Sequence, residues 1–220
     1  MTGLLTWNGI PPRIVGSLTE QEQQSVIAYA TSDGREDKYL KDEDVAESLH
    51  PFRNIALGTA NQFVKWGASF DDESYITMDS RYLKIGETNF QRDLNLHSDS
   101  RRGMKQLREK NKTTLRLIAV SDTTSQFIDL TQEEDIQPLL ECHRILYGPT
   151  YESTLLTLAH SKGQVLKPRP WDVVLCDAIT PHLPEGVDSP HRRIVQSAWI
   201  EMTLPSNWQE RVKSGDAPRL

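Results

Sequence analysis

Short apolar runs and alternating hydrophobic and polar positions dominate the second half of the chain. The clearest are residues 113–120, 172–176 and 193–202, each bounded by turn-forming residues, and each predicts a β-strand. Weaker runs of the same kind predict further strands at 75–78, 82–86, 94–99, 127–130, 154–159 and 164–167. Many short strands at fairly even spacing are typical of a β-barrel or β-sandwich.

The first third of the chain has a different pattern, with helical signals. Two overlapping capping boxes, at 17–20 and 19–22, predict a helix that runs to about Ala30. Residues 55–66 carry apolar side chains at helical spacing, whereas residues 31–45 are almost entirely polar and are expected to form a loop. The expected architecture is therefore mainly β, with helices packed against the barrel or sandwich.

Length and composition indicate one globular domain. The chain has 220 residues and a net charge of −6, with 25 basic and 31 acidic residues. We expect a single domain over 1–220, comprising a helical buttress (1–74), a β core (75–202) and a C-terminal tail (203–220). The acidic balance argues against a nucleic-acid partner that is bound through a basic surface.

Cysteine content and hydropathy bear on whether the protein is disulfide-bonded, zinc-binding, secreted or membrane-bound. The two cysteines, Cys142 and Cys176, form no CxxC pair, so neither a disulfide framework nor a structural zinc site is indicated. Residues 1–16 carry prolines and an arginine where a signal peptide needs an apolar run, and no stretch approaches the roughly 20 apolar residues of a membrane span. We expect a cytoplasmic protein without a membrane partner.

The first candidate for site chemistry is His97-Ser98-Asp99, the single His-x-Asp of the chain. Side chains two positions apart on a strand point the same way, so an imidazole and a carboxylate would face one point. Such a pair supplies two of the three ligands in the 2-His-1-carboxylate arrangement of non-haem Fe(II) sites. A three-residue pattern recurs by chance, so the interpretation depends on a third ligand.

His182 is the candidate third ligand. It follows the strand predicted at 172–176 and precedes a turn-rich loop, after which Arg192 and Arg193 begin another strand. An antiparallel barrel brings such distant segments together. His191 is the rival, but it adjoins the arginines and leaves no loop between a metal ligand and a cation. Asp177 could be a surface turn carboxylate or a partner that holds the imidazole of His182.

The order and spacing of these residues resemble the Fe(II)/2-oxoglutarate-dependent dioxygenases. That family has His-x-Asp, a distal His and an Arg some ten residues later, which here correspond to His97-x-Asp99, His182, and Arg192 or Arg193. The segments 82–86 and 167–172 also resemble the family, and the likeness spans roughly 75–202. It implies a mainly β fold with flanking helices: a double-stranded β-helix, that is, a jelly-roll or cupin-like barrel buttressed by N-terminal helices.

The resemblance also implies an activity. His97, Asp99 and His182 would bind Fe(II) as the catalytic centre, with 2-oxoglutarate and O2 as cosubstrates. The reaction would hydroxylate or otherwise oxidise a C–H bond of a small-molecule or peptide-like substrate, releasing succinate and CO2. Tyr82 and Ser197 are further candidates for binding the cosubstrate. Asp99 argues against the halogenating branch of the family, in which a small residue would open a halide site.

Two arginines compete for the distal carboxylate of 2-oxoglutarate, which a planar guanidinium can bind through two hydrogen bonds. Neighbouring strand residues face opposite sides, so one of the two points into a barrel. We favour Arg193, because a small inward Ser197 would leave room for a cosubstrate. On this register Arg193 shares its face with Val195, Ser197 and Trp199, and Arg192 with Ile194, Gln196, Ala198 and Ile200.

Two other functions remain open. One is a cupin-like metalloprotein with an isomerase or 2-oxoglutarate-independent activity, which would need no cation beyond the distal histidine. The other is a non-catalytic binding or scaffolding protein in which the triad is a coincidence. The substrate, the position oxidised and the oligomeric state are not readable from the sequence. The same holds for the choice among hydroxylation, desaturation, cyclisation and epoxidation.

Overall fold

The structure of the chain is a computed structural model. It describes residues 12–31, 37–41, 50–70, 76–83, 111–121, 125–128, 157, 165–178, 180, 182–184, 193–216 and 218. The predicted strand at 94–99, with His97 and Asp99, lies outside these residues.

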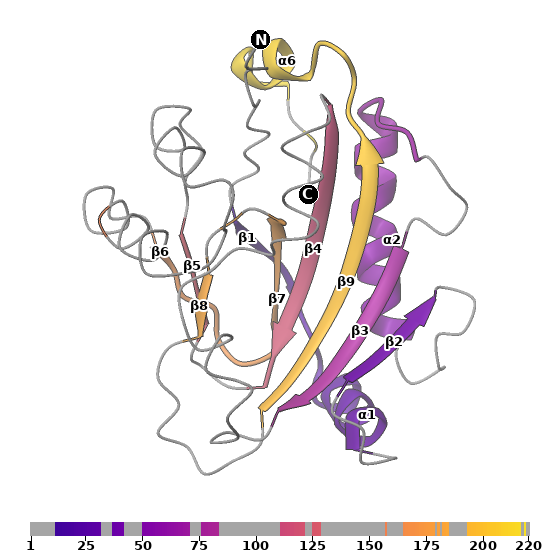
Figure 1. The fold of residues 1–220 in the computed structure, drawn as a ribbon, viewed down its shortest axis with the longest axis vertical. Coiled ribbons are helices and arrows are strands. Elements are labelled where there is room, and N and C mark those ends of the chain that lie inside the picture. The colour runs from indigo at the N-terminus through magenta and orange to yellow at the C-terminus, as the bar shows by residue number, and fades with distance from the viewer. Residues whose placement is uncertain are drawn as a thin grey trace, which may run out of the picture.

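The larger of two sheets has six strands, all paired antiparallel, in the order β1-β7-β4-β9-β3-β2 (Figure 1). The long central strand β4 pairs over its full length with residues 195–203 of β9. The strands are β1 (Arg13–Ser17), β2 (Asp37–Lys41), β3 (Ile76–Leu83), β4 (Lys112–Val120), β7 (Asp172–Asp177) and β9 (Arg193–Thr203).

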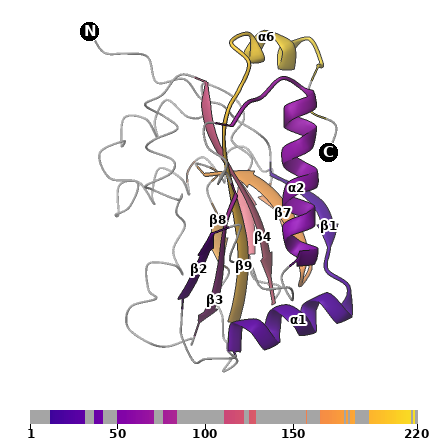
Figure 2. The same cartoon turned by 90° about the vertical axis from the view of Figure 1, so that its right-hand side faces the viewer.

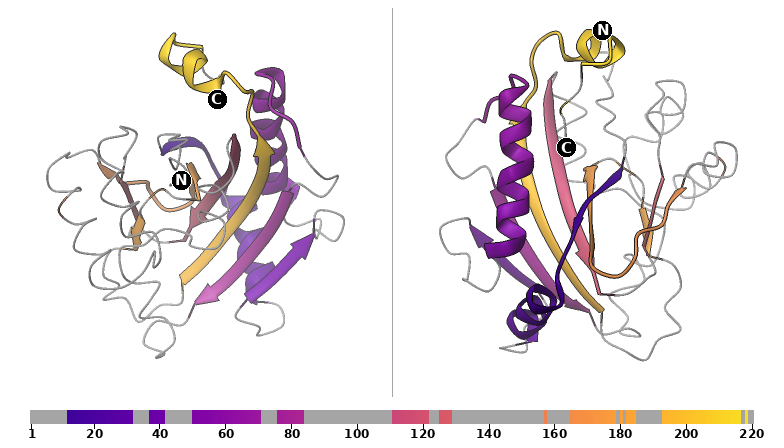
Figure 3. Two further views of the ribbon diagram at one scale, coloured as in Figure 1. Left: turned by 45° about the horizontal axis from the view of Figure 1, so that its top comes forward. Right: turned by 180° about the vertical axis from the view of Figure 1, so that it is seen from behind.

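The smaller sheet has three strands in the order β6-β5-β8, again antiparallel. They are β5 (Ser125–Ile128), β6 (Val165–Leu166) and β8 (His182–Pro184). Figure 3 shows this sheet beside β7 and β4, on the side of the larger sheet away from α2.

The chain passes repeatedly between the two sheets, which defines the fold. From β4 it enters β5 and β6 of the smaller sheet, returns to β7 of the larger, crosses again to β8 and comes back to β9. Two facing antiparallel sheets connected in this way form a double-stranded β-helix, the jelly-roll architecture. The expected fold class is confirmed.

Each face of the larger sheet has its own core. One face, with Leu115, Leu117 and Leu175, packs against the helices in the main hydrophobic cluster. The opposite face meets the smaller sheet in a second cluster. Because successive strand residues face opposite sides, β4 and β7 are buried along nearly their whole length. The second cluster comprises Ile118, Val120, Phe127, Val174, Cys176 and Val195.

Two helices, α1 (Glu20–Thr31) and α2 (His50–Lys65), cover the outer face of the larger sheet (Figure 2). The predicted capping box begins α1: Thr19 N and Oγ1 donate to Glu22 Oε2 at 2.7 and 2.8 Å, and Glu22 N donates to Thr19 Oγ1 at 3.4 Å. None of the helices in the described part of the chain is long and apolar enough to cross a membrane.

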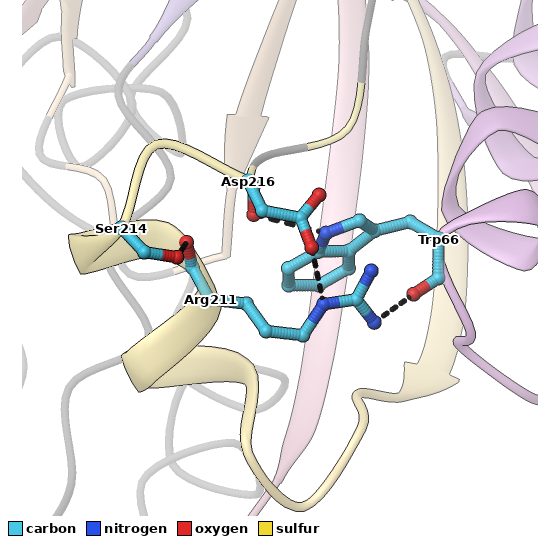
Figure 4. A network of polar contacts seen from close by, with 4 residues as sticks. All are labelled: Trp66, Arg211, Ser214 and Asp216. Atoms are coloured by element: carbon cyan, nitrogen blue, oxygen red, sulfur yellow. Dashed lines mark hydrogen bonds and ion pairs between the residues drawn. The ribbon is translucent and has the colours of Figure 1, made fainter.

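A further helix, α6 (Trp208–Lys213), is held to the end of α2 by a polar clamp (Figure 4). Arg211 stacks on the ring of Trp66, with Cζ 4.7 Å from the centroid, and its Nη1 donates to the Trp66 carbonyl at 2.5 Å. Its Nε donates to Asp216 Oδ2 at 2.6 Å, while Trp66 Nε1 donates to the Asp216 carbonyl at 3.0 Å.

Several local predictions were wrong. Residues 37–41, expected within a loop, form the edge strand β2, which pairs with β3. Residues 76–78 and 82–83, expected in two separate strands, belong to one strand, β3, because its pairing with β9 continues across the polar residues between them. Thr157, within an expected strand, is helical. His182, expected in the connection after β7, begins β8. For β2, β3 and β8, pairing with distant strands overrides the local pattern.

Candidate functional site

The structure describes some of the predicted site residues in full, others only by their backbone, and others not at all. His97, Asp99 and Arg192 lie outside the described residues, and their roles stay predictions. Tyr82 and Arg193 lie in β3 and β9, where the structure describes their backbone: Tyr82 pairs with Ile194, and Arg193 pairs with Leu83. Ser197 and His182 are described in full, and both are buried.

His182 opens β8 and lies in the barrel between the two sheets. Its ring stacks on Phe127 of β5, with centroids 5.8 Å apart and planes at 22°. Its Nδ1 lies 3.0 Å from the carbonyl oxygen of Thr180, which can only accept a hydrogen bond, so Nδ1 carries the proton. In the neutral ring Nε2 therefore presents its lone pair. A backbone-anchored Nδ1–H with the lone pair on Nε2 is the arrangement usual for a histidine that binds a metal.

A tight turn between β7 and β8 fixes that carbonyl. Asp177 Oδ1 accepts hydrogen bonds from Thr180 N at 2.8 Å and from Thr180 Oγ1 at 3.1 Å, and Thr180 Oγ1 accepts from Asp177 N at 3.2 Å. Asp177 is 1% exposed, so the surface-carboxylate interpretation was wrong. Its carboxylate holds the turn whose carbonyl in turn orients the imidazole of His182.

The two faces of β9 are those predicted from its alternation. Val195 belongs to the cluster between the sheets, Ser197 contacts a side chain of β4 there, and Trp199 follows on the same side. Ile194, Ala198 and Ile200 instead join the core beneath the helices.

Arg116 of β4 is a site residue that we did not predict. It is 4% exposed and lies inside the barrel, in register with Trp199 on one side and Cys176 on the other. Its Nε and Nη2 donate to Ser197 Oγ at 3.2 and 3.0 Å, and its Cζ lies 4.7 Å from the centroid of the Trp199 ring. The small inward Ser197, which we expected to leave room for a cosubstrate, instead binds this guanidinium.

Arg116 also contacts His182. Its Nη1 lies 3.3 Å from Nε2 of His182, and since a guanidinium can only donate, Nε2 is the acceptor. This contact agrees with the tautomer inferred above, in which Nδ1 carries the proton. It also connects β4 of the larger sheet with β8 of the smaller. Arg116 thus brings Ser197 and His182, two of the predicted residues, to one point.

A signal for Arg116 was present in the sequence. It is the one charged residue in the apolar run 113–120, and a charge within a continuously buried strand is costly unless it has a specific role or partner. What the run could not indicate was the face or the partners, because those depend on strands more than 60 residues away in the sequence, as the pairing with Ser197 and His182 shows.

The described donors fit a metal site in part. His182 has the correct tautomer and orientation, but its Nε2 lone pair points at Arg116 Nη1, so a bound metal needs the guanidinium to turn away. Within the residues that the structure describes, no three His, Cys, Asp or Glu side chains gather as a metal site. Two further ligands would have to come from residues beyond these ranges, where His97 and Asp99 lie.

No protein-family model and no curated protein matches this sequence. Among solved structures, a Pseudomonas putida prolyl-4-hydroxylase is 12% identical, with a TM-score of 0.45 over 88% of this chain and 91% of that one. The α-ketoglutarate-dependent epimerase SnoN of nogalamycin biosynthesis is 13% identical, with a TM-score of 0.48 over 88% and 80%. HygX from Streptomyces hygroscopicus, with nickel and 2-oxoglutarate bound, is 10% identical, with a TM-score of 0.45 over 90% of this chain and 84% of that one.

Proposed function

We propose that the chain is an Fe(II)- and 2-oxoglutarate-dependent oxygenase that acts on a small-molecule or peptide-like substrate. His97, Asp99 and His182 are the metal ligands in this proposal, and Arg193 binds the distal carboxylate of 2-oxoglutarate. Fe(II) bound there would supply activation of O2 and oxidation of a substrate C–H bond, with release of succinate and CO2 from the cosubstrate.

The observation that carries the proposal is the state of His182. Thr180 holds Nδ1 as the protonated nitrogen, Asp177 holds Thr180, and Phe127 stacks on the ring. These contacts fix Nε2 as a buried, correctly oriented donor inside a double-stranded β-helix. The same orientation is found in histidines that bind a metal, in which the second ring nitrogen usually donates to a carbonyl or carboxylate.

The other residues have separate tasks in the proposal. A His-x-Asp pair on one strand face would complete the three-ligand set. Arg193 starts β9 two residues before Val195, on the alternation that takes Val195 and Ser197 into the barrel. The apolar cluster around Val120 and Val174 excludes water from the reacting centre.

The test is anaerobic titration of the protein with Fe(II), with and without 2-oxoglutarate, followed by the visible charge-transfer absorption of the chelate. We expect a band that needs both components and that disappears in His182→Ala and in His97→Ala. His50→Ala is the matched control, because His50 begins α2 on the opposite side of the larger sheet, and its band should equal that of the wild type.

Two results would overturn the proposal. Metal binding without a band in the presence of 2-oxoglutarate would indicate a cupin-like metalloprotein with a different reaction. Absence of any divalent-metal binding would exclude both metalloenzymes and indicate a binding or scaffolding protein.

A further inference from the structure

His182 Nε2 is both the proposed metal ligand and the acceptor of a hydrogen bond inside the barrel. Arg116 Nη1 lies 3.3 Å from it, and a guanidinium can only donate. A neutral imidazole has one lone pair in its ring plane, and with the proton on Nδ1 that lone pair is on Nε2. The hydrogen bond from Arg116 and a bond to a metal therefore exclude each other, because both use the same lone pair.

The distances lead to the same conclusion. A metal bound to a histidine nitrogen lies about 2.1 Å from it, whereas Arg116 Nη1 is 3.3 Å from His182 Nε2. Two groups that follow one lone-pair direction at these distances would be only about 1.2 Å apart, far closer than a non-bonded contact. Competition for the lone pair needs only this one hydrogen bond, whatever other groups Arg116 contacts.

Two contacts with β9 support the guanidinium in this position. Ser197 Oγ accepts hydrogen bonds from Nε and Nη2 at 3.2 and 3.0 Å, and the Trp199 ring lies against the guanidinium, with Cζ 4.7 Å from its centroid. Both residues belong to the strand that pairs with β4 in the larger sheet. The guanidinium is therefore fixed to its own sheet, and its remaining nitrogen, Nη1, is directed at His182 on the facing sheet.

We propose that Arg116 controls the access of the metal to His182. Its side chain has two positions: the one in the structure, in which Nη1 donates to Nε2, and a second, in which Nη1 has turned away and the lone pair is available. Metal binding selects the second position, so the hydrogen bond lowers the metal affinity. The inference rests on the proposed function, in which His182 is a metal ligand, and adds a competing donor on β4.

The first position also preserves the ligand while no metal is bound to it. His182 is buried, and a buried acceptor without a hydrogen-bond partner is costly. Arg116 supplies a donor for Nε2, and the Thr180 carbonyl supplies an acceptor for Nδ1. The imidazole thus keeps the orientation that a metal requires, at the expense of part of the metal affinity.

The first measurement is the affinity for Fe(II), taken without oxygen and without 2-oxoglutarate, by competition with a chelating dye. We expect Arg116→Met to bind Fe(II) about 10- to 100-fold more tightly than the wild type, because no charged donor has to be removed from Nε2. Ser197→Ala keeps the cation but loosens it, and should raise the affinity by a smaller factor. This second variant separates competition for the lone pair from simple repulsion between two cations.

The second measurement needs no metal. Nitrogen NMR spectra of protein with isotope-labelled histidine report the tautomer and the hydrogen bonding of each ring nitrogen, and His182→Gln identifies the two signals of His182. We expect the Nε2 signal to move to higher frequency in Arg116→Met, as its lone pair loses the donor. The Nδ1–H signal should stay in place, because Thr180 still accepts from it.

Arg211→Met is the matched control. Arg211 stacks on Trp66 with the same 4.7 Å separation as Arg116 on Trp199, but it lies on α6 outside the barrel. It should change neither the Fe(II) affinity nor the signals of His182.

Several outcomes would overturn the inference. Unchanged Fe(II) affinity in Arg116→Met would show that Nη1 does not compete for the lone pair, and weaker binding would make Arg116 a support of the metal site. A rise in Arg116→Met with none in Ser197→Ala would leave charge repulsion as the cause. If Arg116→Met does not fold, the absence of a rise in Ser197→Ala overturns the inference. Absence of divalent-metal binding in the wild type and in both variants would overturn the proposed function as well.

Discussion

Arg116 Nη1 and His182 Nε2 lie 3.3 Å apart, although one residue belongs to the larger sheet and the other to the smaller. The contact is possible because the fold turns the inner face of β4 towards β8. It places a permanent cation beside an imidazole whose tautomer is set by the carbonyl of Thr180.

Removing the Ser197 hydroxyl should destabilise the protein. Ser197→Ala leaves two buried N–H groups of Arg116 without the oxygen that accepts them, which costs about 1–3 kcal/mol. Urea denaturation followed by far-UV circular dichroism measures the loss. Ser25, whose solvent-exposed hydrogen bond is donated to Gln21 O within α1, is the control, and Ser25→Ala should stay within about 0.5 kcal/mol of the wild type. Equal effects of the two substitutions would contradict the role given to Ser197.

Asp177 should control metal binding without touching the metal. Asp177→Ala removes both bonds to Thr180 and frees the carbonyl that orients His182, so the affinity for Fe(II) should fall about 10- to 100-fold. Asp177→Asn keeps an Oδ1 acceptor and should restore most of the affinity. Competition with a chelating dye gives both values. A loss in Asp177→Asn as large as in Asp177→Ala would show that charge, rather than the turn, is what matters.

Replacing Gln196 should stabilise the fold. Its side chain is fully buried. Within the described part of the chain Oε1 has no hydrogen-bond partner, while Nε2 makes one bond of 3.3 Å to Ser197 O. Gln196→Met removes an unsatisfied buried acceptor at similar volume and should raise the free energy of unfolding by about 1 kcal/mol. Gln23→Met is the opposite case: Gln23 Nε2 donates to Leu18 O at 2.7 Å, so its loss should destabilise. Denaturation midpoints that move in the same direction would refute this account.

The clamp on α6 should weaken in acid. The hydrogen bond from Arg211 lowers the pKa of Asp216 below its usual 3.8 and its positive charge acts the same way, against a smaller opposing effect of desolvation. A carboxyl whose pKa is lower in the folded state stabilises that state above the unfolded pKa, and this stabilisation disappears as the pH falls through the folded value. The thermal midpoint of Asp216→Asn should therefore lie below that of the wild type at pH 6, and the gap should close below pH 3.8. A gap that does not change with pH would exclude the ion pair as its cause.

The sequence by itself determined the elements whose signals are local. The capping box at Thr19 and Glu22 forms from residues three apart, and the buried runs of β4, β7 and β9 need only their own apolar content to be recognised. Alternation along β9 also correctly predicted that Val195 and Ser197 lie on one face of the strand and Ile194 and Ala198 on the other. Period two is a property of the strand itself and holds whatever its neighbours are.

Only the tertiary structure decided the rest. The polar β2 is a strand because β3 offers it an edge, and His182 begins a strand because β5 pairs with β8. In the sequence Arg116 is a single charge in an apolar run. In the structure the strand register places it opposite Trp199, and the facing sheet places His182 in contact with it. Hydrogen bonds between strands and contacts between sheets join residues that are remote along the chain, so no local pattern carries them. A local pattern can show that a residue is buried, but its partners depend on how the two sheets close.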